Sequence, residues 1–283
     1  MDAGGARSMN RIGIMQGRLI PDPGAPLQAF PVQGWRQELA ELRSAGLDGI
    51  EWVVTEYGLE ENPVWNDAGV AQARRLAADQ GVAIFSLCFD WFQQAPTFRG
   101  TAGEARRRRE RLFRCVAAAA GLGARAFLIP LLGQAVPADP VEESAWVDCL
   151  SALTVPLRET GLLLLIESDP GADRTADWMR RAGVVHWGEV CDLGNWTAAG
   201  LDPVKGIAAA GGRLGEIHLK DRRPGGPNVP LGAGAVDFSA CFEQLVRSGF
   251  SGPMILETPP GIEPIRSAGQ FREFVERHWP CLK

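Results

Sequence analysis

Short apolar runs and longer amphipathic stretches alternate along the whole chain. The apolar runs predict eight strands, over residues 11–15, 49–54, 82–89, 124–130, 162–167, 186–192, 214–219 and 253–257. Several of these runs are apolar at every position rather than at alternate positions, as in residues 162–166. Continuous apolar runs are typical of parallel strands that are covered on both faces.

Eight amphipathic stretches between and after these runs predict helices, over residues 35–44, 68–79, 105–120, 142–159, 175–181, 203–210, 239–247 and 265–278. A glycine that can adopt the left-handed conformation of a helix end follows each of the first seven, at positions 46, 81, 121, 161, 183, 212 and 249. Eight strands alternating with eight helices, without a linker, predict a single (β/α)8 TIM barrel over residues 11–283 that follows an N-terminal tail of residues 1–10. An open doubly wound sheet is the alternative, but no GxGxxG motif follows the first strand.

Composition agrees with a barrel and excludes several other classes. The 283 residues are close to the length of about 250 that such barrels need. A formal net charge of -5 gives no general attraction to nucleic acid or to an anionic membrane. No apolar run approaches the roughly 18 residues of a membrane span, and the first residues lack the apolar core of a secretion signal. The six cysteines are scattered without a CxxC pair, which predicts reduced thiols and a cytoplasmic protein.

Four consecutive predicted strands, the fifth to the eighth, end in chemically active side chains: Glu167, Asp192, His218 and Glu257. The carboxyl ends of barrel strands carry the chemistry, and neighbouring strands lie about 4.8 Å apart, so these side chains can converge. Each one alone is more often a hydrogen-bonded strand end. Burying three carboxylates together without a cation is costly, however, so the set predicts one divalent metal ion. An oxygen-rich set with one imidazole suits Mn²⁺, with Mg²⁺, Co²⁺ and Zn²⁺ as alternatives.

Further polar and aromatic residues near the strand ends are candidates for binding a substrate. Glu51 ends the second strand and Arg18 follows the first, while Lys220 and Arg222 follow His218. The basic residues, with backbone N–H groups of the glycine-rich loop 225–234, suit a phosphosugar or an acidic sugar, and a solvated loop is the alternative interpretation. Trp91, just past the third strand, could stack on the apolar face of a sugar ring.

The motifs at the four strand ends, IESD at Glu167, CDLGN at Asp192, IHLKD at His218 and ILET at Glu257, resemble those of the xylose isomerase-like barrel proteins. Within that group the likeness is to the sugar phosphate isomerases/epimerases and ketose 3-epimerases, and it covers nearly the whole chain. The resemblance implies that the four residues hold one divalent metal ion. It also implies that Glu167 and Glu257 exchange protons with opposite faces of the substrate through an enediolate, with Asp192 and His218 purely as ligands.

Two positions refine this resemblance. Epimerases of free ketoses often have a histidine three residues after the strand-six Asp, and here Asn195 stands there, which can bond a sugar hydroxyl but cannot carry a proton. Asp173, six residues past Glu167, matches an acidic substrate-binding position of some ketose epimerases. His218 is the single histidine expected at the catalytic rim, which argues against a trinuclear zinc endonuclease.

The resemblance therefore predicts a metal-dependent sugar or sugar-phosphate isomerase or epimerase. A dehydratase of the inosose or dehydroshikimate type is an alternative, because it begins with the same proton abstraction. A non-catalytic barrel that acts as a binding subunit is a second alternative, against which the complete ligand set stands. Barrels of this type often dimerise, and the sequence leaves open whether this chain forms a homodimer.

Overall fold

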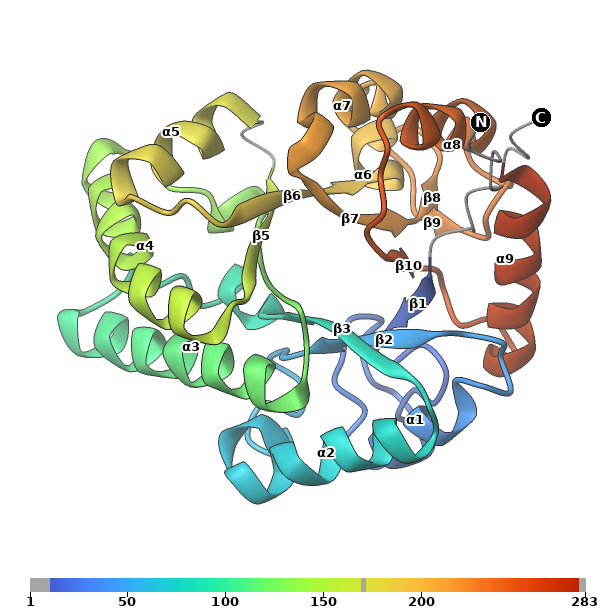
Figure 1. The fold of residues 1–283 in the computed structure, drawn as a ribbon, viewed down its shortest axis with the longest axis horizontal. Helices are drawn as coiled ribbons and strands as arrows, with labels where there is room; N and C mark the ends of the chain where they lie inside the picture. Colours follow the sequence, from blue (N-terminus) through green and yellow to red (C-terminus); the bar gives the residue numbers. More distant parts are fainter. Residues whose placement is uncertain (1–10, 169–171, 280–283) are drawn as a thin grey trace, which may run out of the picture.

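Eight parallel strands close into a barrel in the computed structural model, which describes residues 11–168 and 172–279 (Figure 1). The tail predicted at residues 1–10 lies outside the described residues. The strand order around the barrel is β1-β10-β7-β6-β5-β4-β3-β2. Each strand lies within two residues of its predicted position, and the bounds are β1 (Ile12–Met15), β2 (Gly49–Val53), β3 (Ala83–Cys88), β4 (Ala126–Leu131), β5 (Leu163–Ser168), β6 (Trp187–Asp192), β7 (Leu214–Leu219) and β10 (Met254–Leu256).

Helices surround the barrel, as Figure 1 shows, and all eight predicted helices are present. They are α1 (Trp35–Glu41), α2 (Asp67–Asp79), α3 (Ala102–Leu122), α4 (Pro140–Thr160), α5 (Ala172–Ala182), α7 (Pro203–Ala210), α8 (Phe238–Arg247) and α9 (Pro264–His278). The predicted (β/α)8 barrel is therefore confirmed. In the part of the chain that the structure describes, no helix is both long enough and apolar enough to cross a membrane.

The structure adds several short elements that the hydrophobic pattern does not predict, because they are too short to show a period. Helix α6 directly follows β6, and a two-stranded hairpin follows β7. Four single 3-10 turns complete the set. The bounds are α6 (Leu193–Ala198), β8 (Asp221–Arg222), β9 (Asn228–Val229), η1 (Pro63–Trp65), η2 (Asp90–Gln93), η3 (Gly133–Ala135) and η4 (Gly211–Arg213).

The prediction that a glycine ends the helix is wrong at two positions. Gly121 lies inside α3, which ends two residues later with Gly123 in the left-handed conformation. Gly212 lies in η4, and the positive φ belongs to Gly211 before it. The apolar pattern continues through both positions, so the sequence does not show which of two nearby glycines ends the helix. The other five adopt a positive φ as predicted.

The apolar core lies between the strands and the helices, while the barrel interior near the carboxyl ends of the strands is polar. Helix α4 buries Trp146, Leu150 and Leu153 at helical spacing. In contrast, Glu216 and His218 are both fully buried two residues apart on β7, which places them on the same inward face of that strand. Burying polar groups requires partners, and those partners form the candidate site.

Candidate active site

Asp192 ends β6 and also begins α6. Its Oδ1 accepts a hydrogen bond of 2.8 Å from the backbone N–H of Asn195, so the carboxylate caps the short helix. Its Oδ2 lies 2.8 Å from Nζ of Lys220, at the end of β7. Gly194 makes this approach sterically feasible, because a Cβ at that position would lie 2.8 Å from Cγ of Lys220. The local sequence thus fixes one oxygen of Asp192 and leaves the other facing the site.

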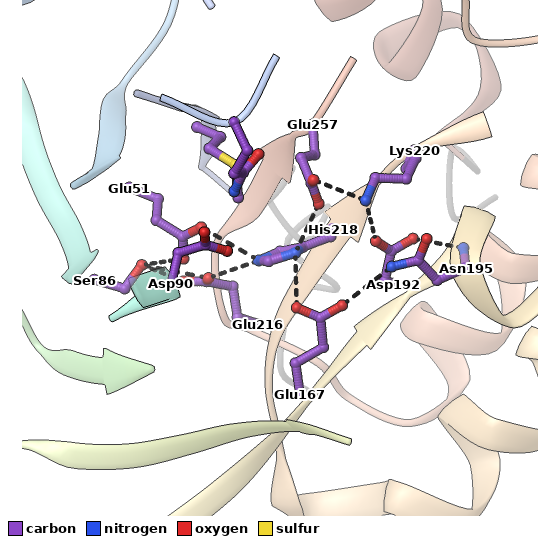
Figure 2. A network of polar contacts seen from close by, with 12 residues as sticks. Glu51, Ser86, Asp90, Glu167, Asp192, Asn195, Glu216, His218, Lys220 and Glu257 are labelled. Carbon is purple, nitrogen blue, oxygen red and sulfur yellow. Dashed lines mark hydrogen bonds and ion pairs between the residues drawn. The ribbon is translucent and has the colours of Figure 1, made fainter. Parts of the chain in front are cut away.

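His218 lies fully buried at the centre of the polar network in Figure 2. Its Nδ1 is 3.2 Å from Oε2 of Glu257 and 3.7 Å from Oε2 of Glu167. Its Nε2 faces the opposite way, toward Glu216 and Glu51. The imidazole therefore separates two groups of carboxylates, one toward the strand ends and one in the barrel interior.

Glu257 follows β10 and is 7% exposed. Its Oε1 lies 2.7 Å from Nζ of Lys220, which therefore contacts both Glu257 and Asp192. Arg18 approaches the same oxygen at 3.8 Å. Two cations thus fix one oxygen of Glu257, and its other oxygen faces His218.

Glu167 is the second-to-last residue of β5, and Asn195 contacts it from α6. The side-chain amide of Asn195 donates a hydrogen bond of 3.3 Å to Oε1 of Glu167. Arg222 in turn donates to Oδ1 of Asn195 at 3.0 Å. This chain of contacts fixes the direction of the amide, because a guanidinium can only donate and so requires the oxygen of Asn195.

Three of the four predicted ligands lie close enough together to hold a divalent cation. One ligand atom from each of Glu167, Asp192 and His218 lies within 4.8 Å of the others, and all three residues are buried. Neither Glu167 nor Glu257 forms a hydrogen bond with Nδ1 of His218, although Oε2 of Glu257 lies 3.2 Å from it. Oxygen and imidazole ligands around one point suit Mn²⁺ or Mg²⁺, so the residues present would hold such an ion.

Burial and neighbouring charges move the pKa values of these groups in opposite directions. Burial raises the pKa of Glu167 to about 8, with Asp192 and Glu257 adding to the shift and His218 opposing it. Burial would also raise the pKa of Glu257, but Lys220, His218 and Arg18 outweigh it and hold that pKa well below its ordinary value. Without a metal ion, the pKa values of the two glutamates are therefore shifted in opposite directions although both approach the same imidazole nitrogen.

A cavity of ≈ 230 Å³ opens beside these residues. Glu167, Glu257, Lys220 and Asn195 all contribute to its wall. The remaining wall consists of Met15, Gln28, Cys88, Asp90, Gln93 and Leu132. Burial raises the pKa of Asp90 to about 6, while the hydrogen bond that Gln93 donates to it acts in the other direction. A wall of amides, carboxylates and one ammonium suits a polar ligand with several hydroxyl groups.

Five residues predicted to bind substrate do not line this cavity, and one of them, Arg222, donates to the cavity residue Asn195. Glu51 is fully buried in the barrel interior, beyond His218 as seen from the cavity. Arg18 is 1% exposed and donates to the backbone oxygen of Leu27, so it supports Glu257 from the side. Asp173 is exposed in the first turn of α5. The indole N–H of Trp91 donates to Glu56, and its ring does not line the cavity.

The glycine-rich loop after β8 is organised around Asp221. The Asp221 carboxylate accepts hydrogen bonds from the N–H groups of Gly232 and Gly234, at 2.9 and 2.8 Å, and from that of Val236 at 3.2 Å. Gly234 is required here because a Cβ would lie 2.1 Å from Oδ1 of Asp221. Two of the N–H groups that the loop 225–234 offers to a phosphate are therefore already bound to a carboxylate of the chain itself.

The sequence interpretation missed three residues around His218 and in the cavity: Glu216, Ser86 and Asp90. Glu216 and Ser86 are fully buried inside the barrel, and Asp90 is 5% exposed in the cavity wall. A signal for Glu216 exists, because a glutamate two residues before His218 on one strand shares its inward face. Ser86 gives no such signal, since a serine within an apolar strand is ordinary.

Comparison with known proteins was made on sequence and on structure. The model of the family described as xylose isomerase-like TIM barrel matches residues 39–275. The L-ribulose-5-phosphate 3-epimerase UlaE of Salmonella paratyphi A is 36% identical over 88 residues, which are 30% of this chain and 31% of that protein. The matched segment therefore spans about a third of the length of this curated relative.

Two solved structures share the fold at low sequence identity. A structure of L-ribulose 3-epimerase superposes with a TM-score of 0.77 at 19% identity, covering 96% of this chain and 95% of that one. The D-psicose 3-epimerase of Clostridium cellulolyticum H10, solved with D-tagatose, gives a TM-score of 0.75 at 12% identity and covers 96% and 100%. At such identities the superpositions establish the barrel fold alone.

Proposed function

Because this chain belongs to the xylose isomerase-like TIM barrel family, we propose that it is an isomerase that epimerises or isomerises a sugar with the help of one divalent metal ion. One observation carries the proposal: Glu167 and Glu257 approach the same nitrogen of His218 and both line one cavity. The names of the relatives, epimerases of ribulose 5-phosphate, ribulose and psicose, agree with this reaction class.

In the proposed reaction, one glutamate removes the proton from the carbon next to a ketone and the other returns a proton. Return from the opposite face inverts the carbon, which requires two carboxyl groups in different protonation states around one substrate. The surroundings of Glu167 and Glu257 differ in this sense, since without a metal ion the pKa of Glu167 is raised and that of Glu257 is lowered. When bound by Glu167, Asp192, His218 and Glu257, the metal ion would supply positive charge for the oxygen that becomes negative.

Neighbouring residues orient the two glutamates for this exchange. Lys220 contacts Oε1 of Glu257 at 2.7 Å, and Asn195 donates to Oε1 of Glu167 at 3.3 Å. These contacts hold each carboxyl group in one orientation, so that its second oxygen stays directed at the centre of the site.

The wall of the cavity favours an uncharged ketose over a sugar phosphate. Glu257 and Asp90 bring carboxylates to it, and the ammonium of Lys220 is already paired with two carboxylates. The loop N–H groups near β8 are bound to Asp221. A phosphate dianion would therefore meet repulsion in the cavity and a loop whose donors are already used.

A panel of ketoses, ketose phosphates and inososes incubated with Mn²⁺-loaded protein in D₂O tests the proposal. We expect deuterium at the epimerised carbon without loss of water, and abolition of turnover by chelation or by Glu167→Gln or Glu257→Gln in folded protein. Glu263→Gln, an exposed glutamate after β10, is the control. Full activity in either active-site variant would remove that glutamate from the proton exchange, and loss of water would identify a dehydratase.

We also place the protein in the cytoplasm. Cys88, Cys115, Cys149, Cys191 and Cys241 are all free and buried in the structure. Reduced thiols are typical of a reducing compartment.

A further inference from the structure

A second group of polar residues lies on the interior side of His218, where the proposed proton exchange does not use it. Glu51 comes from β2, Ser86 from β3 and Glu216 from β7, so the group spans the barrel interior (Figure 2). All three side chains, and that of His218, have 0% exposure. Two buried carboxylates next to each other are costly, and they therefore require a function or a structural reason.

The contacts within this group converge on the second nitrogen of His218. Nε2 lies 3.3 Å from Oε1 of Glu216 and 3.6 Å from Oε1 of Glu51. The Ser86 hydroxyl joins the two glutamates, at 2.9 Å from Oε2 of Glu51 and 3.0 Å from Oε2 of Glu216. Glu51 and Ser86 are partners in the β2–β3 register, directly after a register shift between Ile50 and Glu51.

The groups that face the two nitrogens of His218 determine which nitrogen carries its hydrogen. A neutral histidine has one N–H donor and one lone pair, and an acceptor at one nitrogen determines which nitrogen carries the hydrogen. Carboxylate oxygens face both nitrogens, but only the contact between Nε2 and Oε1 of Glu216 has the geometry of a hydrogen bond, so the hydrogen belongs on Nε2. The lone pair of Nδ1 then points to the side where Glu167 and Glu257 lie.

We propose that Glu216 is the positioning residue of His218, with Glu51 and Ser86 holding Glu216 in place. Glu216 accepts the Nε2 hydrogen, fixes the ring and leaves Nδ1 as the metal-binding atom. This inference rests on the proposed metal centre and assigns a role to residues that touch neither the substrate nor the ion. Such partners of a ligating histidine typically change metal affinity by about 10–100-fold.

The test measures Mn²⁺ affinity by titration calorimetry on the full chain, for wild type, Glu216→Leu, Glu216→Gln and Ser86→Ala. We expect a Kd about 10–100-fold weaker for Glu216→Leu, a smaller loss for Glu216→Gln because its amide oxygen still accepts, and a loss of a few-fold for Ser86→Ala. Glu189→Leu is the matched control, because Glu189 is 8% exposed on the neighbouring strand β6 but pairs with Arg213. It should bind Mn²⁺ as wild type does.

A second measurement follows the ring hydrogen directly, by ¹⁵N spectra of Zn²⁺-loaded protein labelled at histidine. The chain has three histidines, and His218 is the one whose signals should respond to the metal. We expect its hydrogen on Nε2 in wild type, exchanging faster with water in Ser86→Ala. This readout needs no activity and remains usable if Glu216→Leu does not fold.

The outcomes separate the two proposals. A wild type that binds no Mn²⁺ overturns the metal centre and this inference with it. A wild type that binds one Mn²⁺, with an unchanged Kd in folded Glu216→Leu and Glu216→Gln, overturns the positioning role alone. A hydrogen found on Nδ1, or two metal ions per chain with one lost in Glu216→Gln, would place a cation between Glu216 and His218 and also overturn it.

Discussion

Lys220→Met removes the cation that two of the proposed metal ligands share. Nζ of Lys220 lies 2.8 Å from Oδ2 of Asp192 and 2.7 Å from Oε1 of Glu257, and these carboxylates are 0% and 7% exposed. Without Lys220 and without a metal ion, Asp192 loses this charge and Glu257 keeps the guanidinium of Arg18, at 3.8 Å. Methionine keeps most of the volume of the lysine stem, so packing beside Gly194 is retained.

The expected magnitude follows from the burial of the pair. Removing one partner of a buried ion pair costs about 3–5 kcal/mol, and at about 2–4 °C per kcal/mol the metal-free variant should melt on the order of 10 °C below wild type. A divalent cation neutralises the same carboxylates. The variant should therefore recover at least about half of that loss in saturating Mn²⁺, and it should bind Mn²⁺ more tightly because no ammonium competes for the ligands.

Thermal unfolding monitored by circular dichroism, in EDTA and in Mn²⁺, measures both effects. Lys205→Met is the control, because the side chain of Lys205 is 86% exposed and its pair with Asp202 should contribute about 0–1 kcal/mol in either condition. An equal loss of melting temperature for Lys220→Met in EDTA and in Mn²⁺ would refute the reasoning. It would mean that the ion does not neutralise Asp192 and Glu257.

Two further predictions concern pH and substrate charge. Burial raises the pKa of Glu38 from 4.5 to about 7, so wild type loses stability as the pH rises from about 4.5 to about 7 while Glu38→Gln does not. In urea titrations Glu38→Gln should gain about 2–3 kcal/mol relative to wild type between about pH 5 and pH 8. An equal gain in Glu41→Gln, on the same helix, would contradict this. The negative cavity wall predicts a KM for an uncharged ketose about tenfold below that for its phosphate, and the reverse order in steady-state kinetics would show that phosphate is accommodated.

The strand ends could be predicted from the sequence because a barrel converts chain order into position. Once eight strands are identified, the last inward residue of each is brought to one rim, so Glu167, Asp192, His218 and Glu257 could be placed together without coordinates. The alternation of apolar runs and amphipathic stretches carries this information locally. The repeat of strands and helices and the residues at the strand ends are therefore enough to predict this group of side chains.

The direction of individual side chains could not be predicted in the same way. Glu51 is predicted at the end of its strand but lies in the middle of β2, where a register shift beside Ile50 accompanies its place in the barrel interior. The sequence predicts that Arg18 binds substrate, but in the structure its side chain is buried next to Glu257. These outcomes depend on contacts between residues far apart in the chain, such as the 130 positions that separate Ser86 from Glu216.

The proposed ligands share one feature that relates the fold to the chemistry: the chain holds one polar atom of each. Oδ1 of Asp192 caps α6, Oε1 of Glu167 accepts from Asn195, and Oε1 of Glu257 contacts Lys220. Nε2 of His218 faces Glu216. In each residue the other polar atom is directed toward the centre of the site, so the ligand geometry exists before any ion binds. An ion entering this site would not have to order the ligands, and its affinity would depend chiefly on displacing Lys220 and on neutralising the carboxylates.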